Sequence, residues 1–137
     1  MEVEKLRALY KKYGLTENDV YKHKHYIIIT RPGIDKIQAI ENIYIQYNVV
    51  AVHPDYCAVK AIANKKDVYI QTFGSAKHGD YKSGNTTTWY VLEMAEKRAM
   101  SRAVLKLTGF YELGVFGEDE SESFKKSVSS KPQITKI

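Results

Sequence analysis

The chain has 137 residues, of which 44% are hydrophobic and 27% charged, as in one ordinary folded domain. Its single cysteine, Cys57, excludes an internal disulfide and a multi-cysteine zinc site. No apolar run approaches the roughly 20 residues needed to cross a bilayer. The N-terminal sequence MEVEKLRALYKK lacks the apolar centre of a signal peptide. We therefore expect a soluble intracellular protein without membrane contact.

The net charge is +5, from 21 Lys and Arg against 16 Asp and Glu. From Glu118 onward, four acidic residues balance four lysines, so the excess of 17 basic over 12 acidic residues lies before that point. A basic surface attracts polyanions through counterion release and long-range steering. Eleven tyrosines add rings that can either fill a core or stack on nucleic-acid bases.

The N-terminal third predicts short elements. Apolar residues at helical spacing predict a helix over Glu2–Tyr13, and the Thr16–Asp19 pair resembles a capping box that opens a second short turn. The β-rich run Tyr26–Thr30 predicts a strand that ends at Arg31-Pro32-Gly33, because Pro and Gly break regular pairing. A second helix is predicted over Ile34–Asn42.

Three strands with hairpin connections are predicted next. Residues 43–51 alternate, with Ile43, Ile45, Tyr47, Val49 and Ala51 expected on the half-buried face. A turn at 53–55 precedes a strand over Tyr56–Ala63, and the polar turn 64–67 leads to a third strand over Val68–Phe73 that Gly74 closes.

The remaining chain is predicted as a polar loop over Ser75–Thr87 and a long helix over Thr88–Thr108 with Gly109 as its cap. The fold class is thus α+β: an antiparallel three-stranded β-meander followed by a long helix, a β-β-β-α core with short N-terminal helices. We divide the chain into residues 1–33 (N-terminal helix and short strand), 34–116 (core) and 117–137 (flexible tail).

The long helix carries the most informative pattern. Arg98, Arg102 and Lys106 are spaced by four residues and predict one basic stripe, whose mutual repulsion a bound anion would relieve. A solvated basic face near Glu93 and Glu96 is the alternative interpretation. Two apolar stripes flank the helix, so we expect it to pack on its own sheet and also on a neighbouring subunit. Their members are Leu92, Ala99, Ala103 and Leu107 on one side, and Tyr90, Met94 and Leu105 on the other.

The segments YCAVKAIANKKDVYIQTFG and EMAEKRAMSRAVLKLTGF, with the acidic GEDE that follows, resemble the Rad-fifty-two-type single-strand annealing proteins, including small phage and bacterial ones, over roughly residues 33–120. The resemblance implies a β-β-β-α core, a homo-oligomeric ring or arc, and single-stranded DNA bound in a basic groove between the sheet and the rest of the subunit. It implies annealing in homologous recombination or DNA repair without ATP, catalysis or a cofactor. Consistently, the phosphate-binding pattern GxxxxGK[ST] is absent from the sequence.

The resemblance assigns DNA contacts to Arg98, Arg102 and Lys106 on the helix, and to the lysines at 60, 65 and 66 on the central hairpin. Tyr69, which shares the polar-side register of its strand with Gln71 and Phe73, is a candidate for base stacking. A single-strand-binding protein or an exonuclease is a further candidate partner. The expected location is the cytoplasm of a bacterial or phage-infected cell, or its nucleoid.

Other functions stay open at this stage. The chain could be a phage-encoded, inhibitor-like module that binds a protein or RNA with the same basic face. Glu93 and Glu96 could hold Mg²⁺ in a small nuclease, and His23 and His25 could bind a metal together with His53 or His78.

Three further residue types carry two interpretations each. Cys57 is expected as a core thiol rather than a nucleophile, and Trp89 and Tyr90 as core anchors. The acidic run 118–122 is either a solubilising linker or a self-shielding element that competes with DNA for the basic groove.

Overall fold

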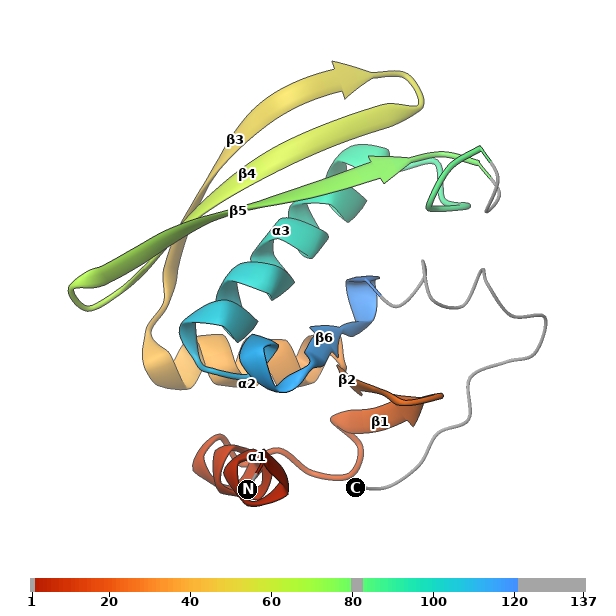
Figure 1. Ribbon diagram of the computed structural model, residues 1–137. Helices are drawn as coiled ribbons and strands as arrows, with labels where there is room; N and C mark the ends of the chain where they lie inside the picture. The colour runs from red at the N-terminus through yellow and green to blue at the C-terminus, as the bar shows by residue number, and fades with distance from the viewer. Residues whose placement is uncertain (1, 80–82, 121–137) are drawn as a thin grey trace.

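The computed structural model describes residues 2–79 and 83–120, which form two three-stranded sheets and three α-helices (Figure 1). The helices are α1 (Glu2–Lys12), α2 (Arg31–Glu41) and α3 (Val91–Leu107), with a 3-10 turn η1 (Tyr111–Leu113). The large sheet contains β3 (Tyr44–His53), β4 (Tyr56–Lys65) and β5 (Val68–Lys77); the small sheet contains β1 (Val20–His23), β2 (Tyr26–Ile29) and β6 (Val115–Gly117). The predicted α+β class and the meander followed by a long helix are confirmed.

The large sheet is antiparallel in the order β3-β4-β5, and α3 lies along one of its faces (Figure 1). The helix packs against β4 and β5 and scarcely reaches β3. The strand side chains beneath the helix are small and buried, among them Cys57, Val59, Ala61 and Ala76. Small side chains let a helix approach a sheet closely, so this alternation of small residues positions α3.

The predicted half-buried face holds at Ile43 and Ile45, which belong to the core or pack against it, but is wrong farther along β3. Tyr47 and Val49 are 37% and 53% exposed, because β3 is an edge strand that lies beyond the reach of α3. A β-bulge between Val49 and Ala51 also shifts the register, so that Ala51 points to the opposite face from the one predicted and Val52 takes its place.

The helix α2 begins at Arg31, where the sequence predicted a strand terminator. Thr30 is its N-cap and accepts a hydrogen bond from the Gly33 amide, and Pro32 stands in the first turn, where its missing N–H costs no helical bond. The Glu118 carboxylate accepts a bond from the Arg31 amide at 2.6 Å. The prediction also missed β1, which pairs with β2 in a tight hairpin.

The small sheet is completed from the C-terminal side. β6 runs parallel to β2, pairing Ile27 with Val115, and the buried Ile29, Phe110 and Val115 belong to one core cluster. The predicted tail boundary at residue 117 is therefore wrong, because Gly117 belongs to β6 and the chain makes ordered contacts as far as Glu120. The rest of that predicted tail, 121–137, lies outside the described residues. Within the described ranges, no helix has the length and apolar character needed to cross a bilayer.

Candidate nucleic-acid interface

The face of the large sheet opposite α3 is the first surface of interest, and we call it the outer face. Directly paired residues of neighbouring strands point to the same side, so the registers give its rows. From the β4–β5 turn these rows read Tyr44–Asn64–Tyr69, Gln46–Ile62–Gln71, Asn48–Lys60–Phe73, Ala51–Ala58–Ser75 and His53–Tyr56–Lys77. In Figure 1, no helix or strand of the described chain covers this face.

Large aromatic rings stand exposed on the outer face. Tyr44, Tyr69 and Phe73 are 61%, 62% and 53% exposed, although rings of this size usually gain by burial. Lys60 lies half-buried on the central strand directly opposite Phe73. Amide side chains fill positions between the rings. An uncovered sheet that mixes rings, amides and a lysine can stack on bases and hold phosphates.

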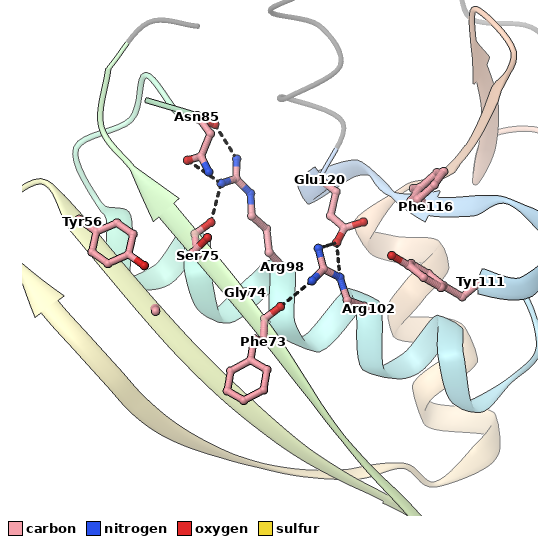
Figure 2. A pocket seen from close by; sticks show the side chains of 11 residues that line it. Tyr56, Phe73, Gly74, Ser75, Asn85, Arg98, Arg102, Tyr111, Phe116 and Glu120 are labelled. Atoms are coloured by element: carbon pink, nitrogen blue, oxygen red, sulfur yellow. Dashed lines mark hydrogen bonds and ion pairs between the residues drawn. The ribbon is translucent and has the colours of Figure 1, made fainter. Parts of the chain in front are cut away.

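A pocket of about 500 Å³ opens beside β5, and we call it the β5-edge pocket (Figure 2). Its walls come from β4, β5, α3 and the C-terminal part of the described chain. They are Tyr56, Ala58, Phe73, Gly74, Ser75, Asn85, Arg98, Arg102, Tyr111, Phe116 and Glu120. The pocket and the outer face meet at Phe73, whose ring belongs to the outer face and whose carbonyl accepts a bond from Arg102 at 2.8 Å.

Arg98 does not lie on an open basic stripe as predicted. Its side chain is only 4% exposed. The guanidinium donates to the carbonyls of Asp119, Ser75 and Asn85 at 2.9 Å each, and to the Asn85 side-chain oxygen at 3.1 Å. The sequence could not reveal this burial, because the acceptors come from three distant segments. Figure 2 shows the Arg98 side chain reaching Asn85 and Ser75. Because its acceptors lie on separate segments, Arg98 joins these parts of the fold.

Arg102 is half-buried in the same pocket and carries a carboxylate partner. Its Nε and one terminal nitrogen contact Glu120 at 2.8 and 2.6 Å, and Glu120 is itself 7% exposed. The neighbouring Asp119 carboxylate accepts from the Ser101 hydroxyl and lies 3.8 Å from Arg31. Residues 119 and 120 are thus held by internal contacts, whereas residues 121 and 122 lie outside the described residues, and competition of the acidic run with DNA stays a prediction.

The predicted lysines are dispersed. Lys106 is exposed, with its ammonium 5.3 Å from the centre of the Tyr111 ring. Lys65 lies 3.6 Å from Glu41, whereas Lys66 is exposed in the β4–β5 turn, where its φ is 54°. The structure thus places Lys60 and Tyr69 on the same outer face, on separate rows, and brings Arg98 and Arg102 together in the β5-edge pocket, but it does not form one continuous basic stripe.

The Glu41 carboxylate, which pairs with Lys65, has several further hydrogen-bond and ion-pair partners. The Tyr13 hydroxyl donates a hydrogen bond to it, and the ammonium of Lys12 lies 3.2 Å from it. The Tyr13 bond, helped by Lys12 and Lys65, lowers the pKa of Glu41 against the opposing effect of burial. Burial and the same hydrogen bond raise the pKa of Tyr13. Lys65 is consequently engaged in a structural cluster.

The alternative chemical sites gain no support from the geometry. Within residues 2–79 and 83–120, no three His, Cys, Asp or Glu side chains gather into a metal site, and Glu93 and Glu96 are both exposed. Cys57 is 2% exposed in the core, as predicted. Trp89 and Tyr90 are not the predicted core anchors: they are 81% and 36% exposed.

Sequence reasoning missed several residues of these surfaces. Phe73 could have been found, because alternation already placed it on the same face of its strand as Tyr69. Tyr44 lies on another strand, and its position on the same face follows only from the strand registers. Asn85 and Glu120 had no such signal, since their roles depend on tertiary contacts with Arg98 and Arg102.

Comparison with protein-family models, with curated proteins and with solved structures gave no match for this chain. The resemblance to the Rad-fifty-two-type annealing proteins therefore stays a prediction from the sequence.

Proposed function

We propose that the protein binds single-stranded DNA on the outer face and promotes annealing of complementary strands without ATP. The observation that carries the proposal is the uncovered outer face, which presents three exposed aromatic rings and Lys60: Phe73 lies directly opposite Lys60, and Tyr44 and Tyr69 lie on the row of Asn64, nearer the β4–β5 turn. A folded chain gains nothing from leaving such rings in water, whereas bases offer flat apolar surfaces that match them.

Tyr69 and Phe73 have the central role in this proposal. They stand four residues apart on β5, with Gln71 between them on the same face. The two rings are about 13 Å apart along the strand, so bases separated by at least one intervening nucleotide can stack on them, while Lys60 and the turn lysine Lys66 attract the backbone phosphates. Stacking holds a base by its flat side, so its pairing edge stays available to a complementary strand.

Replacing Tyr69 by Ala tests the stacking step. We expect the dissociation constant for a fluorescent single-stranded oligonucleotide, measured by anisotropy, to rise about tenfold, which corresponds to about 1.4 kcal/mol of lost stacking. The matched variant Tyr69→Phe keeps the ring and should bind nearly as the wild type does. Equal affinities of the Ala variant and the wild type would contradict the proposal.

Lys60→Ala tests the electrostatic step, with Lys11→Ala on the exposed face of α1 as the charge-matched control. Lys60→Ala should lower both the affinity and the slope of log affinity against log salt, by about one counterion, whereas Lys11→Ala should change neither.

Annealing itself is measured with two complementary oligonucleotides that carry a donor and an acceptor dye. Wild-type protein should accelerate pairing in the absence of nucleotide, and Tyr69→Ala should lose most of that acceleration. Binding of single-stranded RNA or of a protein without any acceleration of pairing would favour the alternative interaction module.

A further inference from the structure

The strand β3 has an unusual composition for a sheet edge. Its ten residues, YIQYNVVAVH, include no Asp, Glu, Lys or Arg, in a chain where charged residues make up 27%. Natural proteins usually protect an exposed edge with charged side chains, proline or a covering element, because an open edge templates pairing with another strand. No helix or strand of the described chain pairs with the free side of β3.

The helix-facing side of β3 is also uncovered and apolar. Its residues Tyr47, Val49 and Val52 pair with buried residues of β4. They are nevertheless 37%, 53% and 60% exposed, because α3 packs over β4 and β5 and does not cover them. Leu92, one helical turn before Glu96 on α3, is 40% exposed. We call Tyr47, Val49, Val52 and Leu92 the β3 flank.

The β3 flank remains uncharged at neutral pH although Tyr47 can ionise. Burial, together with the nearby Glu96 carboxylate, raises the pKa of Tyr47 to about 12. Because neither β3 nor the β3 flank contains a Lys or Arg residue, this surface itself offers no cation to the phosphates of a nucleic acid, and its natural partner is another uncharged strand with an apolar underside.

The other edge of the same sheet is already occupied. Arg102 and Arg98 donate to the outward carbonyls of Phe73 and Ser75. The Lys77 amide donates to the Asn85 side-chain oxygen, and the Lys77 carbonyl accepts from the amides of Asn85 and Thr86. A head-to-tail ring in which β3 of one copy joins β5 of the next would require these bonds to break. Pairing of β3 with β3 requires no such loss and is closed by a two-fold axis.

We propose that two copies of this chain associate through antiparallel pairing of their β3 strands, which joins the two large sheets into one sheet of six strands. In this arrangement both α3 helices lie on the same side, and the two copies of the β3 flank cover each other. The inference does not depend on DNA binding, since the outer face lies on the opposite side of the sheet.

The experiment is light scattering coupled to size exclusion on the full chain without nucleic acid. Wild-type protein should have twice the 15.7 kDa mass of the monomer. Val49 is near the middle of β3, so Val49→Lys brings two like charges together across the axis. This variant should raise the dimer dissociation constant about a hundredfold, because two buried valines are lost as well. Val3→Lys, at a valine of α1 that is similarly exposed at 56%, is the matched control and should remain dimeric.

Mixing two oppositely charged variants distinguishes a variant that has lost the interface from one that has misfolded. Val49→Glu should also be monomeric alone, and a mixture of the Lys and Glu variants should recover dimers through opposite charges across the axis. A wild-type chain that stays monomeric at the highest concentration reached would overturn the proposal. So would a Val49→Lys variant that keeps the wild-type assembly, or a mixture that recovers no dimer.

Discussion

The guanidinium of Arg98 donates to acceptors on β5, on the segment before α3 and on the C-terminal segment, and so joins three parts of the chain that are distant in sequence. All of these acceptors are oxygens without formal charge, and they accept hydrogen bonds from the guanidinium N–H groups. Such a buried network loses stability sharply when its centre is removed, because every acceptor then loses its partner at once.

Arg98→Ala should therefore lower the free energy of unfolding by about 3 kcal/mol or more, measured by urea denaturation. Arg98→Lys should rescue little, because an ammonium cannot reproduce the planar fork. The exposed Lys106→Ala is the control, with an expected change below about 1 kcal/mol. A stable Arg98→Ala variant would contradict the structural role, and any loss of DNA binding by this variant must be compared with its loss of folding.

Glu41 gives the fold a dependence on pH. Its carboxylate pKa is lowered in the folded state from the ordinary 4.5, so the unfolded chain takes up a proton at a higher pH than the folded one. Stability from this group is thus complete above about pH 5 and is lost as the pH falls through the folded-state pKa. Urea denaturation of wild type and Glu41→Gln at decreasing pH should show the smaller decline in the variant; equal declines would contradict this assignment.

At the scale of elements, the contact between β5 and α3 depends on Gly74. A Cβ at this position would collide with the carbonyl oxygen of Ala95 and the amide nitrogen of Ala99, which are backbone atoms that cannot rotate away. The sequence prediction took Gly74 as the end of the strand, but the strand continues to Lys77 because the glycine serves close packing rather than a turn.

Gly74→Ala should consequently push α3 away from the sheet and lower the free energy of unfolding by about 2 kcal/mol or more. Ser75→Ala, at the next residue with an exposed side chain, should be nearly neutral. Thermal denaturation of the two variants makes the comparison, and similar midpoints would show that the helix can accommodate the methyl group.

Local patterns predicted most elements of this fold, because alternation and helical spacing are properties of neighbouring residues. The three meander strands and α3 were found in this way. The parallel pairing of β2 with β6 and the burial of Arg98 were not, since both depend on residues far apart in the chain. For the candidate site, strand register placed Tyr69 correctly on an exposed face, whereas helical spacing alone could not distinguish an exposed arginine from a buried one.

For the molecule as a whole, the acidic segment 118–120 fastens the C-terminal part of the described chain to both α2 and α3. Glu118 caps the amide of Arg31, and Glu120 occupies Arg102. If a phosphate reaches the β5-edge pocket from the outer face, it must compete with the Glu120 carboxylate for Arg102.

Glu120→Gln should therefore increase the affinity for single-stranded DNA several-fold, measured by anisotropy at fixed salt. Glu112→Gln removes the same charge at an exposed position of η1 and is the control. A similar increase in both variants would mean that only net charge matters and that Glu120 does not compete.

The parallel pairing of β2 with β6 also determines which parts of the chain can fold first during synthesis. β2 is made early, yet its partner is almost the last described segment to leave the ribosome. The meander and α3 connect neighbours in sequence and can assemble while translation continues. The small sheet cannot be completed until β6 has been synthesised, so β2 has an unpaired edge until then. A chain that stops before Val115 would leave the isoleucines of β2 exposed to proteases and to other nascent chains.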